Sequence, residues 1–385
     1  MLCFPIFPDV DTVANGLFQT DVGDALKLYN DDWEKLKTGK YAEVESLLEW
    51  RPVVTDISVW LPPALHTESG AERRVGVELE FAGLEPAQII SCVQAQFGGR
   101  LERHNSFEFS IHDTELGKFV IELDATYIKS LGALMEESGD LDDEFSIEAV
   151  ATELLTKAAE QFVPWELVTP PVPLSRLPEV YQLFSRLRNA GALGTRNSIR
   201  YAFGLHLNPE LPAVGTETIL AYLRAYLCLY EWIADRDQID LTRKLTNYIK
   251  HFGKDYLQLV IDWDYNPGLS KLIDDYIDFN PTRNRSMDML PLFAFLDEAR
   301  VRNRLDDPRI KSRPTLHYRL PNCDIDNQVW NLDLPWQHWL EVERLATDPE
   351  RLRRFCSRYA DYLDSFTTPF DTEWLNTSRK MLQEK

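Results

Sequence analysis

Hydrophobic and polar residues alternate in short segments from Arg73 onward. Because successive side chains of a β-strand point to opposite faces, this period of two predicts strands. The predicted strands cover residues 75–81, 107–112, 119–127, 164–169, 199–208 and 314–320. We expect the segments 107–112 and 119–127 to pair as a hairpin within an antiparallel sheet.

Apolar residues at helical spacing separate these strands. Pro86 and Gly98 mark the start and the end of one predicted helix, since proline suits the first helical turn and glycine the end. Further helices are predicted over residues 143–162, 176–190, 217–235 and 254–278. An antiparallel sheet with helices packed on one face is an α+β fold, which is the class we expect.

The chain divides into three predicted regions. Residues 1–70 read as an N-terminal helical extension, and residues 71–330 hold all the predicted strands. Residues 331–385 form a C-terminal helical segment, in which two packed helices are joined at Asp348 and Pro349.

The polar faces of the strands combine charged residues with small ones. Glu78 and Glu80 share one face of their strand with Gly76 and Ala82, about 7 Å apart, and the small residues leave space above the sheet. Exposure of one sheet face to solvent would explain such a polar face in any single strand. The repetition of this pattern favours a binding surface, which also carries Glu108, Ser110, His112, Glu122, Asp124, Arg200, His206, Asn208, His317 and Arg319.

These residue types indicate a particular chemistry. Carboxylates with one or two histidines make a site for a divalent metal ion, and guanidinium groups such as those of Arg200 and Arg319 bind phosphate or carboxylate. Together they point to phosphoryl or acyl-phosphate chemistry. The remaining histidines lack an acidic or histidine partner at ligand spacing and are interpreted as structural: His66, His104, His251 and His338.

Charge and composition exclude several other functions. The formal charge of −21 is spread along the chain, and such a surface repels nucleic acid and anionic membranes. The N-terminal residues lack the pattern of a signal peptide, and no stretch approaches the roughly 20 apolar residues that cross a bilayer. The five cysteines form no C-x-x-C pair, which argues against both a disulfide framework and a structural zinc site. We expect a cytoplasmic protein that binds neither nucleic acid nor membranes.

Several motifs in a fixed order resemble a known family. GVELEF, ELVTPP and GLHLNP, followed by a late strand that ends in Tyr318 and Arg319, resemble the amidoligases of the glutamine synthetase and γ-glutamylcysteine synthetase superfamily. The resemblance covers residues 73–330. It implies a glutamine-synthetase-like catalytic domain over 71–330, in which a curved antiparallel sheet carries helices on its convex face and binds Mg-ATP on its concave face. Mn²⁺ is an alternative metal.

The resemblance also implies roles for individual residues. Metal binding is implied for Glu78, Glu80, Glu166 and His206, with Asn208 beside them. Arg319 is expected against the transferred phosphoryl group, and Asp124 near the acceptor substrate, where Glu122 is a further candidate to orient the amine. Nucleotide binding is expected from Arg283 and Arg285, with Arg200 as another anion-binding candidate.

One position departs from the family pattern. The late strand of the family reads E-x-R, whereas this chain has His317 before Tyr318 and Arg319. A neutral imidazole can bind a metal ion but adds no negative charge, so metal preference or activity is expected to differ. We expect His317 to titrate near the ordinary imidazole pKa of about 6.5.

The predicted activity is that of an ATP-dependent carboxylate–amine ligase. It would form an amide, of γ-glutamyl type among others, through an acyl phosphate at a di-metal site, from a small carboxylate and an amine or from a peptide. Two alternatives remain open: a small-molecule kinase of the same fold, and a catalytically weak nucleotide-binding regulatory protein. The sequence specifies neither the two substrates nor an oligomeric state.

Overall fold

The computed structural model describes residues 56–105, 107–123, 165–195, 203–239, 251–365 and 372–384. Within Ile57–Lys385 the chain forms one compact unit. Four of the sequence predictions fall outside the described residues: most of the N-terminal extension, the helix over 143–162, and the site candidates Asp124 and Arg200.

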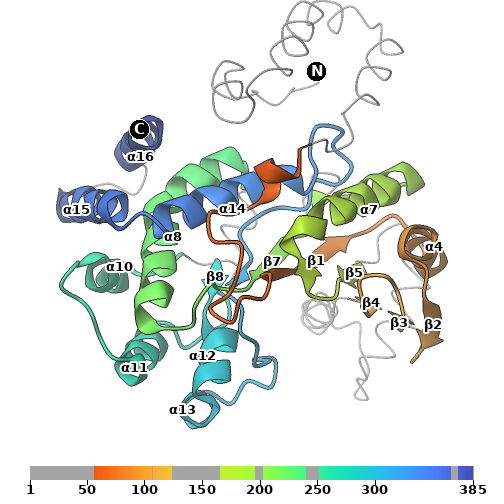
Figure 1. Ribbon diagram of the computed structural model, residues 1–385, viewed down its shortest axis with the longest axis horizontal. Coiled ribbons are helices and arrows are strands. Elements are labelled where there is room, and N and C mark those ends of the chain that lie inside the picture. The colour runs from red at the N-terminus through yellow and green to blue at the C-terminus, as the bar shows by residue number, and fades with distance from the viewer. Residues whose placement is uncertain are drawn as a thin grey trace, which may run out of the picture. The chain divides into compact units, whose positions relative to one another are not determined.

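The described strands form one antiparallel sheet in the order β2-β3-β4-β5-β1-β7-β9-β8, with β6 paired to β1 (Figure 1). The bounds are β1 Arg74–Phe81, β2 Arg100–Arg103, β3 Glu108–His112, β4 Phe119–Leu123, β5 Trp165–Val168, β6 Val172–Pro173, β7 Leu205–Pro209, β8 Met287–Asp288 and β9 His317–Tyr318. The predicted hairpin is confirmed, because β3 pairs with β4.

Ten α-helices and two short 3₁₀ helices lie within the described residues. The α-helices are α4 Pro86–Phe97, α7 Leu177–Ala190, α8 Thr216–Arg236, α10 Lys254–Ile261, α11 Leu269–Phe279, α12 Leu290–Leu296, α13 Glu298–Arg302, α14 Asp333–Ala346, α15 Pro349–Ser365 and α16 Glu373–Gln383. The 3₁₀ helices are η1 Ile57–Trp60 and η2 Leu174–Arg176. No helix in this part of the chain is long and apolar enough to cross a membrane.

The alternation in β1 explains how the sheet separates two environments. Val77 and Leu79 are fully buried, and Leu79 lies opposite Leu167 on β5 and Leu205 on β7. The alternate residues of β1 face the other side and are only partly buried. The predicted α+β class is therefore confirmed as a large open antiparallel sheet with an apolar and a polar face.

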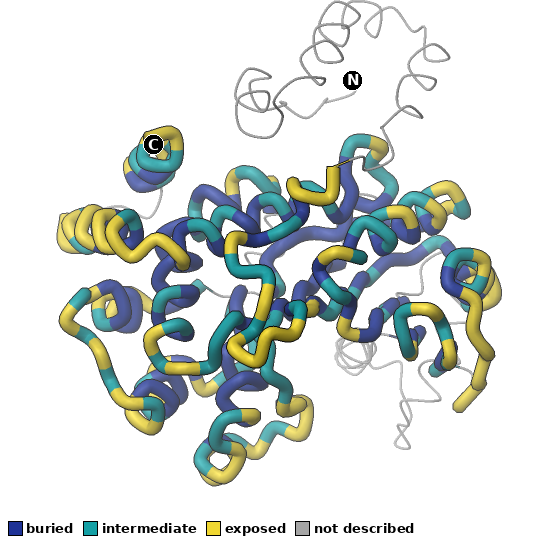
Figure 2. Tube along the Cα trace, viewed as in Figure 1, coloured by how far each residue is buried: buried dark blue, intermediate teal, exposed yellow. Residues whose placement is uncertain are grey.

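Helices cover the apolar face from one side of the sheet to the other (Figures 1 and 2). Phe97 of α4 stacks on Phe119 of β4 at 5.3 Å between ring centroids. Toward the other side, Tyr318 of β9 packs against Tyr226 of α8 at 5.8 Å and Trp339 of α14 at 5.1 Å. The opposite, polar face is left for the candidate site.

Local signals account for the helix ends. The Glu85 side chain accepts from the backbone of the first turn of α4, the Gln88 side chain accepts from the backbone N–H of Glu85, and Pro86 occupies the first helical turn. Gly98 ends α4 with a φ of 67°, a conformation that favours glycine. The sequence prediction of this helix is confirmed.

Other predicted elements differ from the structure. The helix predicted over 254–278 is two helices, because Pro267 and Gly268 stand between α10 and α11 and interrupt the backbone hydrogen bonding. The strand predicted over 314–320 is a continuous strand only at His317 and Tyr318, with an isolated bridge between Thr315 and Glu210. The strands β2 and β8 and the last helix, α16, were not predicted.

Candidate functional site

A row of glutamates crosses the polar face of the sheet. Glu80 on β1 lies directly opposite Glu166 on β5, which lies opposite Glu122 on β4. Glu122 in turn lies opposite Glu108 on β3. Directly opposed like charges destabilise a sheet. This register therefore favours a cation on the polar face.

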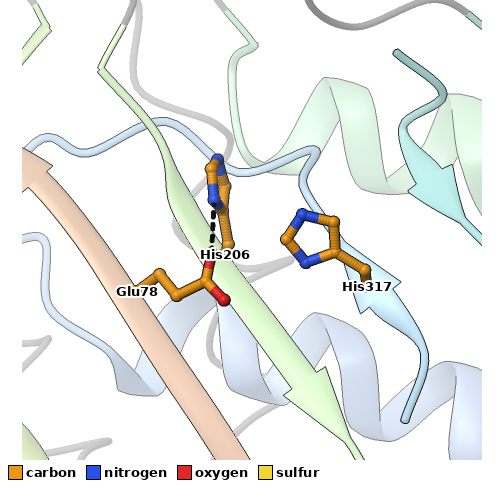
Figure 3. Close-up of side chains that lie close together, drawn as sticks. All are labelled: Glu78, His206 and His317. Atoms are coloured by element: carbon orange, nitrogen blue, oxygen red, sulfur yellow. Dashed lines mark hydrogen bonds and ion pairs between the residues drawn. The ribbon is translucent and has the colours of Figure 1, made fainter. Parts of the chain in front are cut away.

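Glu78, His206 and His317 form the first group of potential metal ligands. Each offers one ligand atom, and these atoms lie within 4.8 Å of one another. The Nδ1 atom of His206 lies 3.2 Å from Oε2 of Glu78, and the two imidazole rings lie 5.3 Å apart. Figure 3 shows that the three side chains come from the neighbouring strands β1, β7 and β9.

Glu80, Glu166 and His206 form a second group, again with ligand atoms within 4.8 Å of one another. The Nε2 atom of His206 lies 3.5 Å from Oε1 of Glu80. The other carboxylate oxygen of Glu80 accepts a hydrogen bond from the backbone N–H of Gly204 at 2.7 Å. His206 thus stands between the two groups, with one ring nitrogen toward each.

Two polar groups contact the Nδ1 atom of His317. The Nδ2 atom of Asn208 donates to Glu78 at 2.8 Å, so its Oδ1 faces His317 Nδ1, 2.7 Å away. That oxygen can only accept, whereas the Arg313 guanidinium, 2.9 Å from the same nitrogen, can only donate, so the two contacts favour opposite tautomers of the neutral ring. The other amino group of Arg313 lies 3.6 Å from Glu78, so this arginine contacts both residues. The neutral ring of His317 offers one nitrogen as a ligand in this group.

The electrostatics favour the same protonation states. Burial raises the pKa of Glu78, but the neighbouring His317, His206 and Arg313 outweigh it and hold this pKa well below its ordinary value. Burial, together with Arg313, holds the pKa of His317 well below that of a free imidazole, although Glu78 opposes the shift. At neutral pH Glu78 is an anion and His317 is neutral, which are the forms that bind metal. The expectation that His317 titrates near 6.5 was wrong, because the ring is buried.

These donors fit a divalent cation. Two atoms bound to one ion at about 2.1 Å lie at most about 4.2 Å apart. The side chains of each group therefore need to close by less than about 1 Å. Glu78, Glu80 and Glu166 supply the negative charge that Mg²⁺ requires, and the two imidazoles extend the set toward Mn²⁺ and other transition ions.

Positive charge collects beside these carboxylates. Arg319 follows His317 by two residues, and one of its amino groups donates to the backbone oxygen of Arg283 at 3.0 Å. Arg283 lies with its Nε 3.5 Å from the fully buried carboxylate of Asp288, which lies opposite His317 in the β8–β9 pair. Burial lowers the pKa of Arg319, while Asp288 and Glu80 act to raise it. The guanidinium group of Arg319 nevertheless remains charged at neutral pH.

Asp288 should make stability depend on pH. Burial raises the pKa of Asp288 to about 6, although Arg283 and the backbone N–H of Leu290 act to lower it. Because the pKa of Asp288 is higher in the folded than in the unfolded state, its contribution to stability is complete below the ordinary value of 3.8 and is lost as the pH rises through about 6. Asp288→Asn keeps an acceptor for Leu290 and carries no charge. Between pH 4 and pH 7.5, the free energy of unfolding of this variant relative to the wild type should rise by up to about 3 kcal/mol, from two pKa units at about 1.4 kcal/mol each.

Thermal unfolding of both proteins without metal at these two pH values measures the difference. An equal difference at pH 4 and pH 7.5 would contradict a raised pKa of Asp288.

Of the remaining sequence candidates, Glu122 lies in the glutamate row. Arg283 and Arg319 lie together, as described above, whereas Arg285 does not join them. Its guanidinium donates to the backbone oxygens of His251 and Phe279 and lies over the ring of Phe252. These contacts give Arg285 a structural role. Asp124 and Arg200 lie outside the described residues.

Sequence reasoning missed three contributors to the site. Arg313 and Asp288 reach it only through the pairing of β9 with β7 and β8, and no local pattern reveals that pairing. The Gly204 N–H that holds Glu80 is a backbone group. The GLHLN motif contained Gly204, and its place on the polar side of the predicted strand 199–208 was the one available signal.

Comparison with known proteins gives one match. A sequence model of a protein family, described as "Putative amidoligase enzyme", matches residues 71–341, which is more than half of the chain. Neither the curated proteins nor the solved structures contain a match to this chain.

Proposed function

Since the chain belongs to this amidoligase family, we propose that it is an ATP-dependent ligase that joins a carboxylate to an amine through an acyl phosphate. The observation that carries the proposal is the pair of ligand groups that share His206 on one face of the sheet. Two divalent ions bound there would neutralise the phosphates of ATP and polarise the γ-phosphoryl group. A glutamine-synthetase-like curvature of the sheet, with the site on its concave face, is part of the proposal.

The first step activates the carboxylate, because amide formation in water is uphill. A carboxylate oxygen of the substrate attacks the γ-phosphorus, a new O–P bond forms, and ADP leaves with the electrons of the broken bond. Arg319 stabilises the charge on the transferred group, with Arg283 beside it. Glu78, Glu80 and Glu166 would hold the metals, while Asn208 keeps Glu78 and His317 in place.

The second step forms the amide. The amine nitrogen attacks the acyl carbon, the C–N bond forms, and inorganic phosphate leaves. Glu122 supplies a carboxylate on the same face, next to Glu166, which can orient the cationic amine and accept its proton. Asp124, two residues later in the sequence, is proposed for the same task.

His317 should set the metal preference. As a neutral nitrogen ligand, the imidazole suits Mn²⁺ better than Mg²⁺. His317→Glu should shift the preference toward Mg²⁺, and Arg313 remains close enough to offset the added charge. Turnover measured with each metal gives the Mn²⁺/Mg²⁺ activity ratio, which should fall several-fold in the variant.

The pH profile offers a second reading of His317. Since its pKa is held well below the ordinary imidazole value, the wild type should keep its activity to below pH 6 with Mn²⁺. Identical metal ratios and pH profiles in the two proteins would show that His317 only packs beside the site.

An ADP-release screen of the full-length protein tests the proposed function. Purified protein with ATP and Mg²⁺ or Mn²⁺ is assayed against amino acids, other carboxylates, polyamines and ammonia, singly and in pairs. A ligase releases ADP and phosphate at a rate that depends on both substrates. ADP release that needs no amine and leaves a phosphorylated product would indicate a kinase. Nucleotide binding without turnover in any pair would support a regulatory protein.

A further inference from the structure

A third group of potential metal ligands lies at the β2 side of the sheet. Glu102 is on β2, His112 is on β3, and His104 begins the turn between them. One ligand atom of each lies within 4.8 Å of the others. β2 is the outermost strand in the order of the sheet, and all four of its residues are exposed. An ion can therefore reach this group from solvent.

The strand register brings these residues onto one face. Glu102 lies opposite Ser110 and Arg100 opposite His112, so Glu102 and His112 are diagonal neighbours. His104 follows Glu102 by two residues and shares its side. Ser110, which faces Glu102 across the strand pair, is fully buried and has a small side chain. Arg100 is turned toward Asp113, 3.8 Å away.

The contacts of the two imidazoles resemble those of metal ligands. The Nε2 atom of His104 lies 2.9 Å from the hydroxyl of Ser110, while its Nδ1 lies 3.8 Å from Glu102. A metal-bound histidine characteristically has its other nitrogen held by a hydrogen bond in this way. The Nε2 atom of His112 lies 2.9 Å from Glu102, yet it is buried and makes no hydrogen bond of acceptable geometry. A metal ion bound between His112 and Glu102 would give the Nε2 atom and the carboxylate oxygen a common partner.

We propose that Glu102, His104 and His112 bind a divalent transition-metal ion of the Zn²⁺ class, with water in the fourth position. Two imidazoles and one carboxylate are a donor set that zinc accepts and that Mg²⁺ does not favour. The ion would join β2 to β3 and so fix the outermost strand of the sheet. About four strand spacings, roughly 20 Å, separate it from the candidate active site on the same face.

This site revises the interpretation of His104 as a structural residue without a partner. Its partner Glu102 stands two residues earlier, which is same-face spacing in a strand. The signal was missed because residues 100–103 were not predicted as a strand.

A Co²⁺ titration followed by visible absorption tests the proposal, because Co²⁺ replaces Zn²⁺ and absorbs strongly in tetrahedral sites. The full chain with His206→Ala is the background, since this change removes the ligand that both groups of the candidate active site share. We expect one equivalent of Co²⁺ with tetrahedral absorption. Adding His112→Ala should weaken its binding at least about 100-fold, because a direct ligand matters more than the 10–100-fold of an outer partner.

Two further variants keep the outcome decisive. Ser110→Ala removes no ligand and should weaken Co²⁺ binding about tenfold through the orientation of His104. His66→Ala, a change at an exposed histidine outside the group, should leave it unchanged. Circular dichroism without metal checks that each variant folds, and Glu102→Gln replaces His112→Ala if the latter does not. Unchanged Co²⁺ affinity in the folded His112 or Glu102 variant would overturn the proposal.

Discussion

Replacing Glu80 with glutamine should lower metal-dependent ADP release more than about 100-fold, because a direct metal ligand matters more than the outer partners whose loss costs 10–100-fold. Glutamine has the size of glutamate but lacks its charge. Its oxygen can still accept the hydrogen bond from Gly204, so the backbone around the site is retained. The substitution thus removes the ligand and leaves the local structure in place.

The same substitution should not destabilise the metal-free protein. Glu80 and Glu166 are directly opposed like charges, and removing one relieves their repulsion. Thermal stability without metal should therefore hold or rise. Glu80→Ala is a less suitable variant, since it leaves the Gly204 N–H without its acceptor, at a cost of about 1–3 kcal/mol. This difference between the two variants comes from a backbone contact that the sequence does not reveal.

Glu108→Ala is the matched control for Glu80. Glu108 lies on the same polar face but on β3, outside both groups of ligands in the candidate active site. ADP release by this variant should stay close to that of the wild type. Equal activity of Glu80→Gln and the wild type at saturating Mg²⁺ would remove Glu80 from the site. Equal losses in both variants would point to the total negative charge of the face rather than to metal ligation.

Sequence periodicity predicted the centre of the sheet well because one face of each strand is fully buried. In β1 a shift of one residue would expose Val77 and Leu79 and bury Glu78 and Glu80, so the pattern permits one assignment. Once the buried face of each strand was assigned, the acids, His206 and Asn208 could be placed on the opposite, polar face. The structure brings together Glu78, Glu80, Glu166, His206 and His317, as the sequence predicted. Their role as metal ligands remains a proposal.

The outer strands of the sheet were harder to predict from the sequence. β8 and β9 are each two residues long, too short for a period of two to appear, and they are held by partners distant in sequence. Asp288 and Arg313 enter the site through these pairings. The protonation of His317 was also inaccessible, because the lowered pKa results from burial, which no local pattern specifies.

Replacing Arg319 with alanine should lower kcat at least about 1,000-fold, the lower end of the effect of an arginine that stabilises a transferred phosphoryl group. Arg319 shares the sheet face of His317, and the carboxylates of Asp288 and Glu80 act on its charge. Its interaction with the phosphoryl group strengthens only as charge develops in the transition state, so the dissociation constant of ATP should change far less than kcat. Steady-state ADP release and equilibrium nucleotide binding separate the two quantities.

Arg319→Lys refines this prediction, because lysine keeps the charge but lacks the planar fork of donors. It should recover part of the lost kcat, whereas Arg309→Ala, at a surface arginine that pairs with Asp307, should leave kcat unchanged. A fall in kcat/KM with kcat intact would contradict the assigned role, since it would show that Arg319 binds ground state and transition state equally. Turnover equal to the wild type in Arg319→Ala would instead move the phosphoryl group away from β9, and Arg283 would then be the arginine to test.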